Sequence, residues 1–445
     1  MKNTRLFARL ESSPLKELFM PRHAALVLPL LLSVALSASA QTKDWPQWRG
    51  PHRDGIGSEK NLLDDWSKVK PKLVWNSKTV AGGKKSIGTG WSTVSVAAGR
   101  IFTMGDHGKD CYIYALEPKS GKQLWETKIG TTRGDGGPRC TPTVDGDRVY
   151  GLTNAGQLAC LDVKSGDIVW SKDYQKDFGG KWMAGWFFCE SPLVDGDKLV
   201  CTPGGDDAGL VALNKKTGEV IWKSAIPGSG GAGYSSIMVS EGGGIRQYVT
   251  MMNRAKGVVG VDAATGNLLW NYNRCTNGTG NIPTVLVKDD LVFASTGYGS
   301  GAALLQLVKS GAGVKVVEKY FLKGNVLQNH HGQMILVDGF VYGGHGHNAG
   351  APFCLDLMTG KFAWGPQSQP GTGSAACAYA DGHIYLRYEE NGIAQIEATP
   401  KSYRLKGVFE VGNIGRGWQQ PVFVDGMMYV RGNNQLLCFD VRKGG

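Results

Sequence analysis

The sequence predicts an all-β fold, an eight-bladed β-propeller of four-stranded antiparallel blades. A phrase ending in Ser/Thr-Gly-x-x-x-Trp recurs about every 47 residues, a period typical of propeller blades. Each unit opens with alternating apolar residues and an Asp-Gly turn, which indicates short antiparallel strands. The 65 glycines, about twice the average usage of ~7%, suit a fold with a tight turn every few residues.

The recurring phrase predicts how each blade ends and how it contacts the next one. Its Asp or Asn can hydrogen-bond the backbone of its own turn, and its glycine supplies a positive φ. The tryptophan falls on the outermost strand, where burying an indole is worth roughly 4–6 kcal/mol at ~25 cal/mol/Å². The copies end at Trp125, Trp170, Trp222, Trp270 and Trp364, and a further copy, residues 304–320, has lost its tryptophan.

Counting the unit openings gives eight blades. The openings lie near Trp91, Arg139, Cys189, Tyr234, Asn281, His331, Ser374 and Trp418. The eighth unit runs out after three strands, whereas residues 72–79, KLVWNSKT, match the end of a unit with Trp75 as its tryptophan. We therefore expect this N-terminal strand to complete the last blade and close the ring, which removes the free edges of an open sheet.

The first 40 residues have the layout of a secretory signal. Arg22 and His23 precede an apolar core, residues 24–36, and Ala38 to Ala40 resemble a cleavage site. We expect residues 1–40 to be a signal peptide, and translation can start at Met1 or Met20. Residues 41–70 are expected to form an N-terminal extension, and residues 71–445 are expected to form the propeller. The apolar run is shorter than the ~20 residues of a spanning helix. Gln41 stands where a lipid anchor needs cysteine. These features predict a periplasmic or secreted monomer without a membrane span or lipid anchor.

Charge and cysteine patterns exclude several functions. The formal net charge is +11, but the basic residues are scattered, so no nucleic-acid partner is expected. The nine cysteines form no CxxC pair, which excludes c-type haem attachment and a zinc ribbon. Cys160, Cys354 and Cys438 occupy a position of the repeat that holds alanine or glycine in other copies, so they are expected in the core. Cys140 and Cys189 open neighbouring blades and are candidates for a disulfide, with the pairing left open.

Candidate ligand-binding residues lie just ahead of the innermost strands, at the expected mouth of the central funnel. They are Trp91, Arg139, Glu190, Tyr234, Asn281, His331, Arg416 and Trp418. The arginines suit carboxylates or phosphates, the tryptophans suit a flat ring, and Glu190 and Asn281 offer oxygens to calcium. Alternatively, strand starts that face water gather polar residues without binding anything.

Histidine and aromatic clusters add weaker candidates. His330 and His331, read as strand neighbours, are expected on opposite faces and therefore not on one metal ion. His345 and His347 are better explained by a solvated loop. The aromatic segment of residues 173–191 suits either a lid or packing across the ring. Trp45, Trp48 and Trp66 are expected to form a structural cap. The catalytic residues stay unknown at this stage.

The repeat phrase, Ala/Gly/Cys-x-Asp/Asn-x-x-Ser/Thr-Gly-x-x-x-Trp, resembles the tryptophan-docking repeat of the pyrroloquinoline-quinone-like (PQQ-like) eight-bladed propellers. The resemblance covers residues 72–443, and residues 44–57 look like the lead-in of secreted bacterial members. It implies two kinds of function. One is quinoprotein alcohol dehydrogenases, which hold PQQ with calcium in the funnel. The other is a non-enzymatic scaffold of outer-membrane barrel assembly.

The sequence favours a binding or scaffold module of the cell envelope over an enzyme. The adjacent-cysteine ring of the family's alcohol dehydrogenases is missing, and no haem segment is present to carry electrons away. The expected partner is an envelope protein or a glycan. The alternative is a periplasmic PQQ- and calcium-dependent alcohol dehydrogenase.

Overall fold

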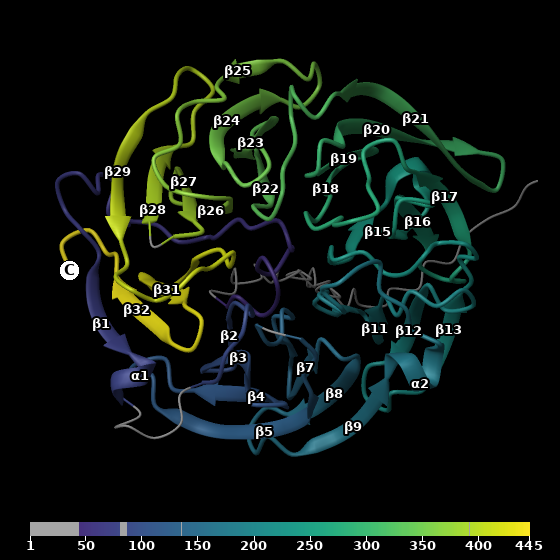
Figure 1. The fold of residues 1–445 in the computed structure, drawn as a ribbon, viewed down its shortest axis with the longest axis horizontal. Helices are drawn as coiled ribbons and strands as arrows, with labels where there is room; N and C mark the ends of the chain where they lie inside the picture. Colours follow the sequence, from purple (N-terminus) through teal and green to yellow (C-terminus); the bar gives the residue numbers. More distant parts are fainter. Residues whose placement is uncertain (1–43, 81–86, 135, 391) are drawn as a thin grey trace, which may run out of the picture. The chain divides into compact units, whose positions relative to one another are not determined.

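The computed structural model describes residues 44–80, 87–134, 136–390 and 392–445. The predicted export signal, residues 1–40, lies outside the described residues. Eight four-stranded sheets are arranged in a ring, and every strand pairing within them is antiparallel (Figure 1). The eight-bladed propeller predicted from the repeat is confirmed.

The strands run from the centre outward in each blade. Blade 1 comprises β2 (Ser95–Ala97), β3 (Arg100–His107), β4 (Asp110–Leu116) and β5 (Gln123–Thr131); blade 2, β6 (Thr143–Asp145), β7 (Arg148–Leu152), β8 (Gln157–Asp162) and β9 (Ile168–Asp173); blade 3, β10 (Leu193–Asp195), β11 (Lys198–Cys201), β12 (Leu210–Asn214) and β13 (Val220–Ser224); blade 4, β14 (Met238–Ser240), β15 (Gln247–Met251), β16 (Val258–Asp262) and β17 (Leu268–Tyr272).

The second half of the ring repeats this order. Blade 5 comprises β18 (Leu286–Lys288), β19 (Leu291–Thr296), β20 (Gly301–Ser310) and β21 (Gly313–Leu322); blade 6, β22 (Met334–Val337), β23 (Phe340–His345), β24 (Ala351–Asp356) and β25 (Phe362–Trp364); blade 7, β26 (Ala375–Ala380), β27 (His383–Tyr388), β28 (Gly392–Glu397) and β29 (Leu405–Glu410); blade 8, β30 (Val422–Val424), β31 (Met427–Arg431), β32 (Leu436–Asp440) and β1 (Lys72–Asn76). Two short helices, α1 (Ser77–Val80) and α2 (Tyr174–Phe178), and the 3₁₀ turn η1 (Gly242–Gly244) lie between strands.

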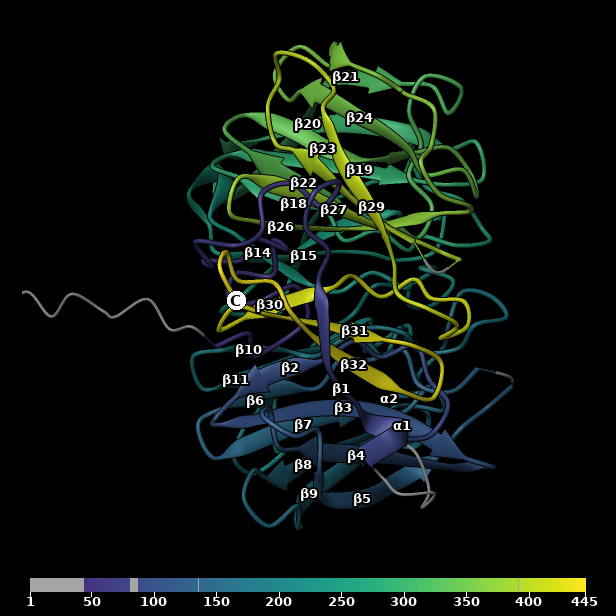
Figure 2. The ribbon, with the colours of Figure 1, turned by 90° about the vertical axis from the view of Figure 1, so that its left-hand side faces the viewer.

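The N-terminal strand closes the ring as predicted. β1 pairs with β32 in antiparallel register, with Trp75 opposite Cys438. Figure 2 shows β1 beside β32, although the two strands come from opposite ends of the chain. Blade 8 therefore has no unpaired β32 edge, which an open ring would leave exposed.

The repeat tryptophans lie on the outermost strands, and the indoles of Trp75, Trp125, Trp170, Trp222 and Trp364 donate to the next blade, whereas that of Trp270 donates to Gln247 of its own blade. Trp125 Nε1 donates to the carbonyl of Val163 (3.1 Å) and Trp170 Nε1 to that of Lys215 (3.1 Å), each in the last turn of the following blade. The Asp of that turn caps it, since Asp162 Oδ1 accepts from the backbone N–H groups of Lys164 and Ser165. The repeated sequence motif thus forms a turn in one blade, and the tryptophan indole of the preceding blade binds to that turn.

The core lies between adjacent blades. One buried cluster joins Leu210 and Trp222 of blade 3 to Tyr248 and Val259 of blade 4, and comparable clusters lie at the other blade boundaries. Cys160, Cys354 and Cys438 are buried in these clusters, as predicted. All nine cysteines are free, so the suggested pairing of Cys140 with Cys189 is wrong.

The N-terminal lead-in, residues 45–67, crosses the ring near its centre and contacts nearly every blade (Figure 1). Arg49 and Arg53 are buried and donate to backbone carbonyls of Met334 and Ser191, respectively. Hydrogen bonds of the lead-in reach residues at or beside the innermost strands of seven blades: Val96, Val144, Ser191, Thr284, Met334, Tyr379 and Asp425. The lead-in is a structural cap, as its tryptophans predicted.

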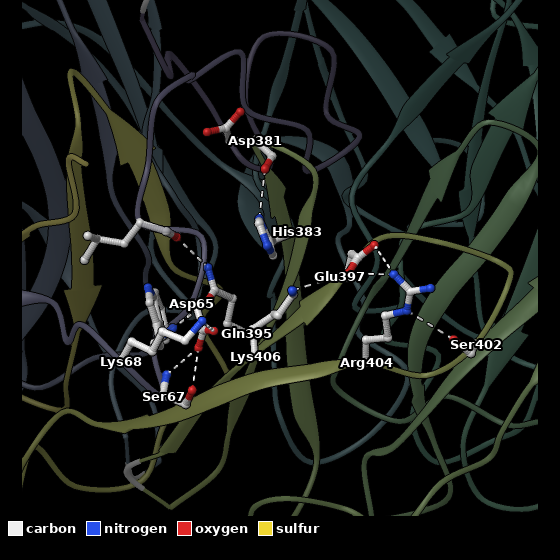
Figure 3. Close-up of polar contacts among 12 residues, drawn as sticks. Asp65, Ser67, Lys68, Asp381, His383, Gln395, Glu397, Ser402, Arg404 and Lys406 are labelled. Carbon is white, nitrogen blue, oxygen red and sulfur yellow. Dashed lines mark hydrogen bonds and ion pairs between the residues drawn. The ribbon is translucent and has the colours of Figure 1, made fainter. Parts of the chain in front are cut away.

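Trp66 ends the lead-in inside the boundary between blades 7 and 8. It is fully buried, and its ring centroid lies 5.1 Å from that of Tyr385 and 5.9 Å from that of Phe409. The Trp66 backbone N–H donates to Gln395 Oε1 (3.0 Å), and Gln395 Nε2 donates to the carbonyl of Leu63 (2.6 Å). Figure 3 shows Gln395 facing the lead-in residues beside it.

No helix among residues 44–80, 87–134, 136–390 and 392–445 has the length and apolar character needed to cross a bilayer.

Candidate functional site

A cavity of about 510 Å³ lies where the innermost strands begin, a volume within the range of small-ligand sites. Its lining comes from residues just ahead of those strands, from residues that follow the second strand of a blade, and from the lead-in through Trp48. Trp48 Nε1 lies 3.4 Å from Thr284 Oγ1, which holds the indole against the wall of blade 5. The lead-in therefore forms part of the cavity wall.

Five of the eight predicted site residues line this cavity. They are Trp91, Arg139, Tyr234, His331 and Trp418. Trp91 and Trp418 come from blades 1 and 8, which ring closure makes neighbours, and their ring centroids are 4.4 Å apart. Residues more than 300 positions apart in sequence are thus brought into one aromatic wall.

The other three predicted residues lie outside the cavity lining. Glu190 is buried inside blade 3, where Oε1 accepts from the hydroxyl of Tyr174 (2.9 Å) and the backbone N–H of Thr202 (2.5 Å); burial raises the pKa of its carboxyl. Asn281 Nδ2 donates to the carbonyl of Met252 (2.8 Å). Arg416 is exposed and forms ion pairs with Glu389 (3.8 Å) and Glu390 (3.5 Å).

The histidine pair differs from the sequence prediction. His330 and His331 lie in a bend rather than a strand, because Asn329 Nδ2 donates to the carbonyls of Gln333 and Gly344 and folds the chain ahead of β22. Their ring centroids are therefore only 3.6 Å apart, and the expectation of opposite faces is wrong. His347 joins them, with its centroid 4.0 Å from that of His330.

Burial keeps the imidazoles of His330 and His331 neutral at pH 7. Desolvation and the neighbouring His347 lower the pKa of His330 to about 4, and desolvation lowers that of His331 well below its usual range. Within the described residues, no three His, Cys, Asp or Glu side chains are placed to hold one metal ion. The stacked rings form a neutral wall of the cavity.

Sequence reasoning missed the lining residues that follow the second strand of a blade. Tyr298 follows β19, His347 and Asn348 follow β23, and Glu389 follows β27. In an antiparallel pair, the end of the second strand lies beside the start of the first, so both loops meet at the same mouth. The strand order already predicted from the repeat would have identified these positions.

The aromatic segment between blades 2 and 3 packs across the ring and also reaches the cavity. Phe188 is buried and packs against Tyr174 of helix α2 with centroids 5.2 Å apart. Trp186 lines the cavity with 41% of its surface exposed, in edge contact with Tyr234. The segment thus packs across the ring and also presents one indole at the cavity.

Positive charge dominates around the cavity. The Arg139 side chain lines it and donates to the carbonyl of Gly137 (3.1 Å). Arg387 is buried behind the wall and donates to Oε1 of Gln419 (2.9 Å), and Arg431 is buried next to it. Burial lowers the pKa of both buried arginines to about 9, which leaves them cationic at pH 7. The lining carboxylate Glu389 already faces Arg416.

The cavity does not fit the calcium and quinone of the PQQ enzymes. Calcium takes six to eight oxygen ligands. The amide oxygens that line the cavity are engaged within the protein: Asn348 Oδ1 with His330 Nδ1, Gln333 Oε1 with Thr284 N, and Gln419 Oε1 with Arg387 Nη1. Among the described residues that line the cavity, Arg139 is the one arginine, because Arg387 and Arg431 lie buried behind the wall and donate to protein carbonyls; a single guanidinium therefore faces a quinone that carries several carboxylates.

Comparison with known proteins agrees with the fold. Residues 109–366 match the model of a family described as outer membrane protein assembly factor BamB. The chain is 23% identical over 299 residues to outer membrane protein assembly factor BamB of Moranella endobia, covering 62% of this chain and 69% of that protein. It is 30% identical over 156 residues to 1-butanol dehydrogenase (quinone) of Thauera butanivorans.

The dehydrogenase alignment covers 32% of this chain and only 23% of the relative, so the chain spans less than a quarter of that relative's length. Among solved structures, quinohemoprotein alcohol dehydrogenase from Comamonas testosteroni superposes with a TM-score of 0.60 at 14% identity, covering 91% of this chain and 81% of that chain. At this identity the likeness shows a common fold alone.

Proposed function

Because the chain belongs to the family of PQQ-like β-propellers matched by the BamB model, we propose that it is a non-catalytic binding or scaffold module of the cell envelope. The observation that carries this proposal is the donor set of the cavity. The carboxylate and amide suggested for calcium, Glu190 and Asn281, make their hydrogen bonds elsewhere, and the amide oxygens that do line the cavity bind protein N–H groups.

The alternative function is a periplasmic quinoprotein alcohol dehydrogenase. It is favoured by the 30% identity to the butanol dehydrogenase over 156 residues. PQQ, when bound, would supply the oxidation chemistry. Within the described part of the chain, no three His, Cys, Asp or Glu side chains are grouped to hold the accompanying calcium.

Titration calorimetry of the purified protein with PQQ, with and without calcium, separates the two functions. We expect no calcium-dependent binding and no dye-linked oxidation of primary alcohols. Micromolar, calcium-dependent binding that is abolished by Arg139→Ala but kept in Arg404→Ala would overturn the proposal, because Arg404 carries the same charge outside the cavity, paired with Glu397 (Figure 3).

The envelope location is part of the same proposal. The signal predicted in residues 1–40 implies a mature N-terminus near Gln41. Mass spectrometry of the protein recovered from the periplasm or medium tests it, and a chain that keeps residues 20–40 in the cytoplasm would contradict it.

A further inference from the structure

Three ring nitrogens of the cavity wall have no hydrogen-bond partner among the residues that the structure describes. They are Nε2 of His330, Nδ1 of His331 and Nε1 of Trp418, all buried. The rings are neighbours, since the His331 centroid lies 3.6 Å from that of His330 and 4.7 Å from that of Trp418. A buried polar atom without a partner is unfavourable, so a ligand that satisfied these nitrogens would gain affinity.

The chemistry of the three nitrogens can be assigned in part. His330 Nδ1 lies 2.8 Å from Asn348 Oδ1, and an amide oxygen only accepts, so Nδ1 carries the hydrogen and Nε2 is an acceptor. The indole Nε1 of Trp418 can only donate. The wall therefore offers a donor on Trp418 and an acceptor on His330, two rings that both neighbour His331, and a hydroxyl group is a common ligand group that both donates and accepts.

The ring faces argue against a flat aromatic ligand. Trp91 and Trp418 cover each other, as do His330 and His331, and Tyr298 packs on His347 with centroids 4.4 Å apart. Trp186 also lines the cavity and is 41% exposed, so part of its indole is available to pack against the C–H groups of a sugar ring.

The charge of the site selects among sugars. Arg139 pairs with no carboxylate in the described part of the chain, and Arg387 and Arg431 add buried positive charge behind Gln419. A guanidinium binds a carboxylate with two parallel hydrogen bonds. An acidic sugar would thus gain a contact that a neutral sugar lacks.

We propose that the central cavity binds a glycan unit that carries a carboxylate, with hydroxyl groups on His330, His331 and Trp418 and the carboxylate on Arg139. This inference rests on the proposed binding function and names its ligand class. The neutral state of the histidines at pH 7 keeps Nε2 of His330 available as an acceptor.

Titration calorimetry with trigalacturonate, maltotriose and 2-naphthoate tests the inference. Trigalacturonate is expected to bind about tenfold or more tightly than maltotriose, since a hydrogen bond to a charged group is worth about 1.5–3 kcal/mol. Arg139→Gln should weaken trigalacturonate by about tenfold and leave maltotriose unchanged. Trp418→Phe should weaken both sugars by about fivefold, because it removes one neutral hydrogen bond.

Arg404→Gln is the matched control, because it removes the same charge from an exposed ion pair with Glu397 outside the cavity, and it should change neither affinity. Thermal unfolding of each variant shows that it is folded. Binding of 2-naphthoate alone, equal binding of both sugars, or an equal effect of the two arginine variants overturns the inference.

A failure of the acidic-glycan inference can be distinguished from a failure of the proposed function. If trigalacturonate does not bind and PQQ with calcium does not bind either, the acidic-glycan inference is wrong while a non-catalytic role stands. If PQQ binds with calcium and alcohols are oxidised, the proposed function itself is wrong.

Discussion

At the scale of single residues, the glycine and tryptophan of the repeat act as a pair across the blade boundary. Gly166 has φ +77°, and a Cβ atom there would lie 2.7 Å from the Trp125 indole of the preceding blade. The same contact joins Gly218 to Trp170. The glycine is therefore required both by the turn and by the close approach of the indole, which explains why the two residues recur together.

Tyr320 replaces the missing tryptophan of blade 5. Its hydroxyl donates to the carbonyl of Leu357 (2.7 Å), and its ring packs on Gly360. Tyr320→Phe is expected to lower the free energy of unfolding by about 1 kcal/mol through loss of that bond, and Tyr320→Ala by about 3–5 kcal/mol through loss of the ring. Denaturant unfolding measures both, and equal effects would show that the hydroxyl, not the ring, docks the blade.

His330 makes stability depend on pH. Its pKa is about 4 when folded, against about 6.5 when unfolded, so the unfolded chain binds the proton more tightly. Stability is therefore lost as pH falls from 6.5 towards 4, by about 2 kcal/mol between pH 7 and 5 from this group.

In His330→Gln the part of the stability loss between pH 7 and pH 5 that His330 causes should disappear. His52→Gln, at an exposed position, should keep the pH dependence of the parent protein. Denaturant unfolding at pH 7 and pH 5 measures the difference. An unchanged pH dependence in His330→Gln would contradict the assignment.

At the scale of elements, blade 7 shows how an incomplete repeat is tolerated. Its outer strand β29 carries no docking tryptophan, and the fully buried Trp66 of the lead-in fills the boundary with blade 8 instead. Gly407 of β29 has φ +139°, and a Cβ there would lie 2.5 Å from the backbone nitrogen of Ser67, so the lead-in approaches this strand closely.

Trp66→Ala should therefore destabilise the protein by about 3–5 kcal/mol, as for other buried aromatic residues. Trp186→Ala removes a tryptophan that is 41% exposed and should cost much less. Thermal or denaturant unfolding compares the two variants. Similar losses would mean that Trp66 does not hold blades 7 and 8 together.

At the scale of the whole molecule, closure by β1 joins the two ends of the chain. A chain that begins at residue 77 lacks both the lead-in and β1 and leaves β32 as an open edge, whereas a chain that begins at residue 71 lacks the lead-in alone and keeps the strand. Open edges pair with other chains. We expect the shorter chain to associate and the longer one to stay monomeric in light scattering, and identical behaviour would contradict the closure role of β1.

Much of the architecture could be predicted because it depends on local chemistry. The turn residues, the period-two strands and the docking tryptophans are each specified within one unit, so their recurrence predicted the blade count and the closing strand. The predicted mouth of the funnel also contains Trp91, Arg139, Tyr234, His331 and Trp418, because a strand start has the same place in every blade.

The sequence by itself therefore determined the repeat, the ring and its closure. Only the tertiary structure decided what each polar side chain contacts. Glu190 and Asn281 are strand-start residues like Arg139, yet they turn into the blades and bond Tyr174 and Met252, and the bend at Asn329 stacks His330 on His331. The physical reason is that a buried polar group takes whichever partner lies within hydrogen-bond distance, and those partners come from distant parts of the chain.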